Sequence, residues 1–135
     1  AGARGNPGPA AFAYLIYGKE GKVLKEWTGY IGIATNNEAE YRGLIAGLEE
    51  AKRMGAEEVT VTMDSELVVN QMLGKYRVKA ANLLPNYERA VELLNHFVKA
   101  QIVHASREHP SIRRADSLVN QELDMMELAQ KIKKR

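Results

Sequence analysis

The sequence predicts an α/β fold in which a mixed sheet is covered by helices. Three observations favour it: two strand-like segments flank a Gly-rich turn near the N-terminus, helical spacing of apolar residues begins at Asn37, and helical and β-branched segments then alternate. Elements of these two kinds pack into layers around one core. Because 135 residues suit one compact domain, we expect a single domain over residues 1–135.

The N-terminal half is expected to hold two antiparallel strands and then a long helix. The segments AFAYLIY and KVLKEWTGYIGIA are rich in apolar, β-branched and aromatic residues on either side of residues 18–21, which contain two glycines. From Asn37 the apolar residues recur at helical spacing with a charged face opposite. Gly55 is expected to end this helix.

The C-terminal half is expected to alternate strands and helices. EEVTVTMD resembles a strand buried on both faces, and Ser65 can cap a short helix that Gly74 stops. Residues 82–100 have helical spacing with Pro85 in the first turn. We expect QIVHA to be the last strand, SREHPSI a loop, and the segment from Arg113 the closing helix.

Composition limits the class of protein. The chain has no cysteine, which excludes disulfides and thiolate metal sites and suits a cytoplasmic location. No apolar run approaches the roughly 20 residues of a membrane span, so no membrane partner is expected. The 19 basic and 17 acidic residues nearly balance, so any nucleic-acid surface must come from their arrangement.

Three acidic residues differ from the rest because they follow or interrupt apolar patterns. Glu40 lies on the apolar stripe of its helix, Asp64 ends a predicted buried strand, and Asp116 lies beside apolar positions of the closing helix. The alternatives are a helix cap for Asp64 and an exposed first-turn residue for Asp116. Carboxylates from three elements suggest one shared site, and oxygen ligands favour Mg²⁺ or Mn²⁺. The pattern therefore indicates a metal-dependent hydrolase.

Four motifs, RGNPGPA, TNNEAEYRGLIAGLEEA, MDSELVVNQMLGKYRVK and RRADSLVN, together span nearly the whole chain. In this order they resemble type 1 ribonuclease H, in the short bacterial and archaeal form without a separate basic protrusion. The resemblance implies a mixed five-stranded sheet flanked by helices. It also implies endonucleolytic cleavage of the RNA strand of RNA/DNA hybrids with two Mg²⁺ or Mn²⁺ ions.

The resemblance also assigns roles to residues of this chain. Its acidic metal-binding and catalytic site falls on Glu40, Asp64 and Asp116. Its contacts to the hybrid fall on Asn36 and Asn37, whose alternative role is to form a turn and a helix cap.

Further residues are expected to meet phosphates. Asn6 and Thr35 match residues that hold a phosphate of the DNA strand, although Asn6 could serve turn chemistry alone. Basic residues in or beside turns, including Arg4, Lys75 and Arg77, are expected to make hybrid binding salt-sensitive.

The first departure from the family concerns its first catalytic Asp. That Asp closes the first strand, normally five positions before the Gly that matches Gly5, which is the position just before Ala1. If one residue is missing from the turn, Ala1 itself takes the place. Most of the first strand is also missing, so we expect the chain as printed to bind metal poorly and to cleave feebly or not at all.

The second departure lies in the loop HASREHPSIRRAD. The family places there a mobile His or Arg that assists proton transfer or product release. Arg107 and His109 are the two candidates, and Arg107 is slightly favoured. The alternative functions are a catalytically silent hybrid-binding module and a domain of a larger enzyme. A monomer is expected.

Overall fold

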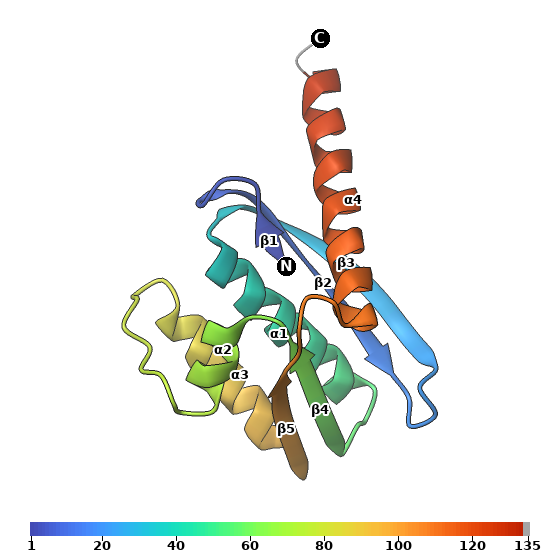
Figure 1. Ribbon diagram of the computed structural model, residues 1–135, viewed down its shortest axis with the longest axis vertical. Helices are drawn as coiled ribbons and strands as arrows, with labels where there is room; N and C mark the ends of the chain where they lie inside the picture. The colour runs from blue at the N-terminus through green and yellow to red at the C-terminus, as the bar shows by residue number, and fades with distance from the viewer. Residues whose placement is uncertain (134–135) are drawn as a thin grey trace.

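The computed structural model describes residues 1–133, which hold five strands and four helices (Figure 1). The strands are β1 Gly2–Ala3, β2 Gly8–Tyr17, β3 Val23–Ala34, β4 Glu58–Met63 and β5 Lys99–His104. The helices are α1 Asn36–Arg53, α2 Glu66–Met72, α3 Leu84–His96 and α4 Pro110–Lys133. Within this range, no helix has the length and apolar content that crossing a membrane requires.

The five strands of the expected mixed sheet are present with the first one largely missing, as expected, and they pair as a three-stranded and a two-stranded part. β2 pairs antiparallel with β3 over its length, and it pairs with β1 only at Gly2 and Ala3. β4 and β5 form a parallel pair. The mixed strand directions and the very short first strand are as expected. Because β1 is two residues long, no strand within residues 1–133 joins β2 to β4.

Helices α1 and α4 cover opposite faces of β2, because successive side chains of a strand point to opposite faces. Ala11 packs with Val119 and Leu123 of α4. Phe12 faces α1 at Gly43, where an added Cβ would lie 3.2 Å from the Phe12 Cβ. The lack of a side chain at Gly43 therefore lets α1 lie close against the sheet.

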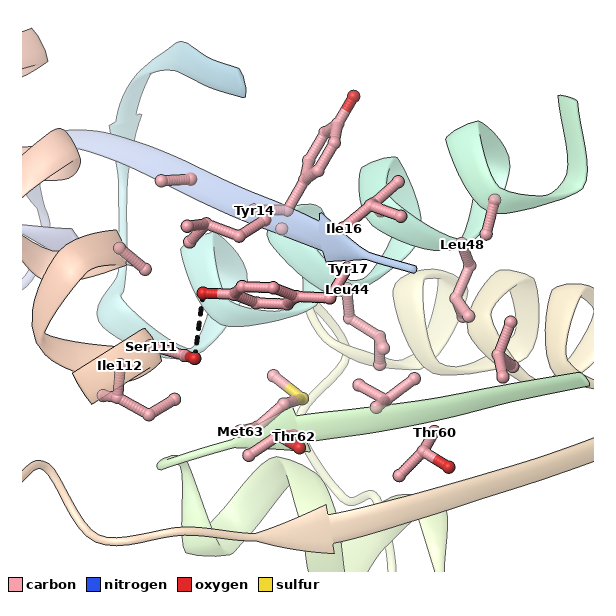
Figure 2. Close-up of a pocket in the computed structure, with 18 of the residues that line it drawn as sticks. Tyr14, Ile16, Tyr17, Leu44, Leu48, Thr60, Thr62, Met63, Ser111 and Ile112 are labelled. Carbon is pink, nitrogen blue, oxygen red and sulfur yellow. Dashed lines mark hydrogen bonds between the residues drawn. The ribbon is translucent and has the colours of Figure 1, made fainter. Parts of the chain in front are cut away.

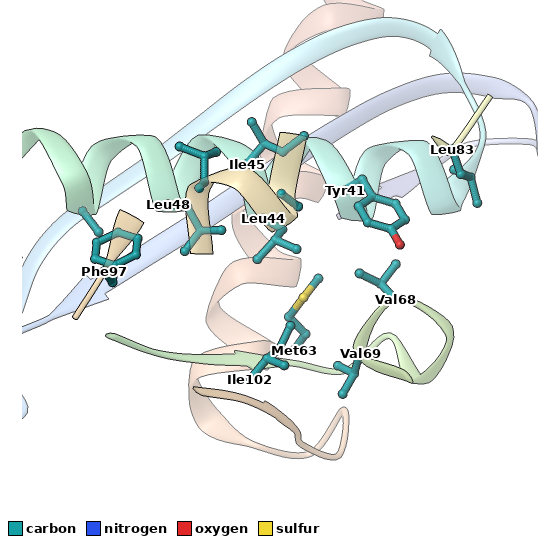
Figure 3. Packing of buried hydrophobic residues seen from close by; sticks show 13 residues of the cluster. Tyr41, Leu44, Ile45, Leu48, Met63, Val68, Val69, Leu83, Phe97 and Ile102 are labelled. Carbon is teal, nitrogen blue, oxygen red and sulfur yellow. The ribbon is translucent and has the colours of Figure 1, made fainter. Parts of the chain in front are cut away.

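The largest core forms where α1 meets α2, α3, β4 and β5 (Figure 3). Tyr41, Val68, Val69 and Leu93 are its largest fully buried side chains. The Tyr41 hydroxyl donates a hydrogen bond of 2.6 Å to Oε1 of Gln71, which is also buried. Burial, followed by the neighbouring Tyr87, raises the pKa of Tyr41 to about 12. This polar pair fixes how α1 and α2 fit together.

Helix ends follow the predicted signals in the first half of the chain. Thr35 caps α1 through its side chain, and Glu38 returns the bond in a capping box. Ser65 caps α2 by accepting from the Val68 amide. Gly55 follows α1 in the left-handed region, where φ is +83°.

The second half shows three differences from prediction. Helix α3 ends at His96, because Phe97 has extended backbone (ψ 148°) and Val98, which fits the helical spacing, is 82% exposed. Helix α4 begins at Pro110 rather than Arg113, because proline suits a first helical turn. Strand β4 is not buried on both faces, since Thr60 and Thr62 are exposed beside the gap between the sheets.

Glu50 is a buried carboxylate on α1 held by two cations. Its Oε1 lies 2.5 Å from Nη2 of Arg53 and 3.1 Å from Nζ of Lys25 on β3. The hydrogen bonds from Arg53 and then Lys25 lower the pKa of Glu50 to about 2. Glu50 thus links α1 to the antiparallel sheet.

Tyr41→Phe is expected to lower the free energy of unfolding by about 1–3 kcal/mol, because the Gln71 amide would stay buried without its donor. Urea denaturation at neutral pH measures the change. Tyr76→Phe is the control, because Tyr76 is 46% exposed and its loss should cost less than about 0.5 kcal/mol. Equal effects of the two changes would contradict the role given to the Tyr41 hydroxyl.

Glu50→Gln is expected to remove an acid-sensitive part of the stability. The folded-state pKa of about 2 lies below the ordinary 4.5, so the ion pairs stabilise fully above pH 4.5 and are lost as pH falls toward 2. Thermal unfolding across this range should show a shallower pH dependence in the variant. Glu49→Gln, an exposed neighbour, should keep the wild-type dependence.

Candidate active site

A groove of about 710 Å³ lies between β2 and β4 (Figure 2). Leu44 and Leu48 of α1 line it, and Ser111 and Ile112 close it from the first turn of α4. The Ser111 hydroxyl donates a 2.9 Å hydrogen bond to the Tyr17 hydroxyl of β2. No local sequence pattern predicts this bond, because residues 106–112 were expected to form a loop.

All three predicted carboxylates line this groove: Glu40, Asp64 and Asp116. Asp64 directly follows the carboxyl end of β4. Asp116 lies in the second turn of α4 and is exposed, so it is not the first-turn residue of the alternative interpretation. Because Ser65 supplies the cap of α2, the cap interpretation of Asp64 is not needed.

Glu40 is the most enclosed of the three, with a side chain 13% exposed. Burial raises its pKa, the amino group of Ala1 opposes this, and the charges of Asp64 and Asp116 add to the rise. The Ala1 nitrogen lies 3.6 Å from Glu40 Oε1. The charges of Asp64 and Asp116 therefore reach Glu40 across the groove.

The donor chemistry fits a hard divalent cation, because the facing groups are carboxylates and the chain contains no cysteine. The spacing is looser than a closed metal site. Among residues 1–133, no three His, Asp or Glu side chains lie close enough together to hold one ion. The metal-binding role of Glu40, Asp64 and Asp116 stays a prediction.

Arg107 and His109 both lie beside the carboxylates. Arg107 is 91% exposed, and its Nε lies 3.9 Å from Asp64 Oδ2. His109 lines the groove, and its Nδ1 accepts a 3.1 Å hydrogen bond from the Ser111 amide. This bond places the proton of a neutral imidazole on Nε2. The geometry is compatible with either residue as the mobile group.

Four predicted hybrid contacts gather at the amino end of α1. The Asn36 amide donates a 3.0 Å hydrogen bond to Asn6 Oδ1, and Asn36 Oδ1 accepts a 2.7 Å bond from the Ala3 amide. Thr35 caps the same end, and Asn37 is the second residue of the helix. The turn before β2 is thus tied to α1 beside Glu40.

The predicted basic residues do not meet the groove. Lys75 and Arg77 are exposed in the turn after α2, and neither lines the groove. Arg4 is engaged within the protein, with Nη2 at 2.7 Å from Asp124 and Nη1 at 2.7 Å from Glu127 of α4. The expectation that Arg4 meets phosphates is therefore not supported by its contacts. The sequence did not predict these ion pairs, because Asp124 and Glu127 lie over 100 residues from Arg4 in the chain.

Comparisons with known proteins identify relatives of this chain. Residues 1–122 match the family model described as reverse transcriptase-like. The bifunctional protein Rv2228c of Mycobacterium tuberculosis is 44% identical over 124 residues, which cover 91% of this chain and 34% of that protein. Ribonuclease HI of Halobacterium salinarum is 40% identical over 121 residues, which cover 90% of this chain and 60% of that protein. The chain thus spans about a third of Rv2228c.

Solved structures of related proteins superpose closely on this chain. The N-terminal RNase H domain of Rv2228c, solved as a fusion with maltose binding protein, superposes with a TM-score of 0.89 at 42% identity, covering 96% of this chain and 92% of that chain. LC11-RNase H1 in complex with an RNA/DNA hybrid gives a TM-score of 0.85 at 42% identity, with 93% of each chain covered. The mixed α/β fold is thus shared with these structures. Ribonuclease H of Hydrogenovibrio crunogenus is 32% identical over 137 residues, which cover 91% of this chain and 90% of that protein. The chain belongs to the ribonuclease H family.

Glu40→Gln is expected to raise the free energy of unfolding at neutral pH, because a buried carboxylate facing two others is costly. Since its folded-state pKa lies above the ordinary value, this cost is absent in acid and grows as pH rises. Thermal unfolding without divalent cations measures it. Glu88→Gln, exposed on α3, is the control. A variant less stable than the parent at neutral pH would contradict the expectation.

Proposed function

We propose that the protein hydrolyses the RNA strand of RNA/DNA hybrids endonucleolytically, leaving a 3′-hydroxyl and a 5′-phosphate. The observation that carries this is the convergence of Glu40, Asp64 and Asp116 on one groove of a ribonuclease H fold. Residues 1–135 would act as one ribonuclease H domain. The lack of cysteine suits work in the cytoplasm, and we propose that the domain acts as a monomer.

The three carboxylates would hold Mg²⁺ or Mn²⁺. Two such ions, when bound, would supply an activated water and stabilise the leaving oxygen. Asp64 is positioned for this by the carboxyl end of β4, and Glu40 by the packing of α1. Neutralising their mutual repulsion would also draw the carboxylates closer together.

The hybrid would lie against the amino end of α1. Asn6 uses its side-chain oxygen to accept from Asn36, so its amide nitrogen remains a donor for a phosphate of the DNA strand. Thr35 likewise accepts from Glu38 and keeps its O–H to donate. Asn36 and Asn37 would contact the hybrid where 2′-hydroxyls distinguish the RNA strand. A helix amino end also favours the phosphate charge.

Arg107 and His109 would serve proton transfer or product release, with Arg107 slightly favoured because its guanidinium faces Asp64. Comparing Arg107→Ala with His109→Ala in single-turnover and steady-state cleavage assigns the role. The residue that acts in product release should slow the steady state more than the single turnover.

A polypeptide with only the printed residues would have three of the family's four carboxylates. We infer that it cleaves more slowly than one with an Asp just before Ala1. The second candidate function, a catalytically silent hybrid-binding module, is favoured by one observation: the three carboxylates of the described chain are not gathered tightly enough for an ion.

Cleavage of end-labelled RNA/DNA hybrid in Mg²⁺ and in Mn²⁺ tests the activity. Slow cutting confined to the RNA strand is expected from the printed residues, and in a chain with an Asp added before Ala1 the change Asp64→Asn should reduce the rate by at least about tenfold. Glu88→Gln should leave the rate unchanged. If the folded chain binds hybrid without cutting it, adding an Asp before Ala1 separates the candidates: restored cleavage supports the enzyme, and continued silence supports the binding module.

Lys75→Ala and Arg77→Ala should each weaken hybrid binding through loss of a phosphate contact. The slope of log affinity against log salt is expected to fall by about 1 for each change. Fluorescence anisotropy with labelled hybrid over a salt series measures it. Lys19→Ala, exposed in the β2–β3 turn, is the charge-matched control. An unchanged slope in both variants would exclude these residues from the interface.

A further inference from the structure

The turn between β1 and β2 is tied to two helices. On one side, the Asn6 side-chain oxygen accepts a 3.0 Å hydrogen bond from the Asn36 amide at the start of α1. On the other side, the Arg4 guanidinium reaches α4, where Nη2 lies 2.7 Å from Asp124 Oδ1 and Nη1 lies 2.7 Å from Glu127 Oε1. Two residues of one short turn are therefore fixed to different helices.

The Arg4 guanidinium is more constrained than it would be in a single ion pair. Besides the two carboxylates, its Nη2 donates a 3.3 Å hydrogen bond to the Asn120 carbonyl of α4. Because a planar guanidinium donates in fixed directions, three acceptors on one helix define both its position and its orientation. A lysine at this place would keep the charge but would not reproduce that geometry.

The turn is tight, so a constraint on Arg4 also acts on Asn6. The Arg4 amide donates a 2.8 Å hydrogen bond to the Pro9 carbonyl, which closes the turn. Gly8 approaches the Arg4 carbonyl so closely that an added Cβ would collide with it. Movement of Arg4 relative to α4 would therefore displace Asn6 relative to α1.

We propose that Arg4 is a positioning residue for hybrid binding, which holds the β1–β2 turn so that the Asn6 amide meets a phosphate of the DNA strand. The guanidinium acts through its contacts with α4 and does not touch the phosphate itself. Asp124 and Glu127 belong to the same support, although neither lines the groove of the three carboxylates. This inference rests on the proposed function and adds residues of α4 to it.

The exposure of these contacts favours a role in positioning over a role in stability. The Arg4 side chain is 33% exposed, and those of Asp124 and Glu127 are 68% and 48% exposed. Ion pairs at such positions contribute little to the free energy of unfolding. Variants that lose them are therefore expected to fold, so that their affinity for hybrid can be measured.

The two possible roles of Arg4 predict opposite effects of Asp124→Ala combined with Glu127→Ala. If Arg4 contacted a phosphate directly, this change would free its charge and strengthen binding. If Arg4 positions the turn, the change should weaken binding about fivefold, because binding must then order the turn. Fluorescence anisotropy with labelled RNA/DNA hybrid, without divalent cations so that the RNA stays intact, measures the affinity. Glu20→Ala combined with Glu49→Ala, at two exposed positions, is the charge-matched control and should not weaken binding.

Substitution of Arg4 itself gives an independent measurement. Arg4→Lys should preserve binding if the side chain contacts a phosphate, and should weaken it about as much as Arg4→Ala if the guanidinium geometry matters. The slope of log affinity against log salt should stay unchanged in Arg4→Ala, because the neutral Asn6 amide displaces no counterion. A slope lower by about 1 would reveal a direct phosphate contact and overturn the inference.

A double substitution separates positioning from general damage to the fold. In the Arg4→Lys background, Asn6→Ala should cost little further affinity, because the amide is already misplaced, whereas additive losses would overturn the inference. Amide exchange at Asn36 should quicken in Arg4→Lys without any hybrid present, and unchanged exchange would also overturn it. If the unmodified chain binds hybrid and the variants bind equally well, only this inference falls. If the unmodified chain does not bind hybrid, the proposed function falls with it.

Discussion

The burial of one side of helix α1 is the constraint on which the rest of the structure depends. Tyr41, Leu44 and Leu48 are buried in the main core. On its other side, α1 packs closely against β2 because Gly43 has no side chain. A helix held on two sides cannot rotate or slide without opening cavities, which cost several kcal/mol for a large side chain. Glu40 precedes Tyr41 and so inherits its position from that packing. The apolar contacts of the neighbouring residues offset the free energy that burying the Glu40 carboxylate costs.

Local signals made much of the fold predictable. Apolar spacing defined α1, and cap residues placed the starts of α1 and α2, because these depend on neighbours a few residues away. Prediction failed where tertiary contacts decide. Val98 continues the helical spacing of α3, yet the chain turns extended at Phe97 so that β5 can pair with β4. Spacing alone cannot distinguish a helix's last turn from a strand that follows at once.

The candidate site was predictable as a set of residues but not as an arrangement. Three carboxylates on apolar patterns pointed to one groove, and they do line one groove. Their separation, the contact of Arg107 with Asp64, and the pairing of Arg4 with Asp124 come from the folded chain. A basic residue in a Gly-rich turn resembles a phosphate contact in sequence. Arg4 instead pairs with acidic residues of α4 because of where this helix lies in the folded chain. No local sequence pattern predicts that position.

Helix α1 also contacts two groups of elements. One group is β1–β3 with α4, and the other is β4, β5, α2 and α3. Helix α1 packs against β2 at Gly43 and against the second group through the main core. A substitution that shifts α1 would therefore disturb its contacts with both groups together.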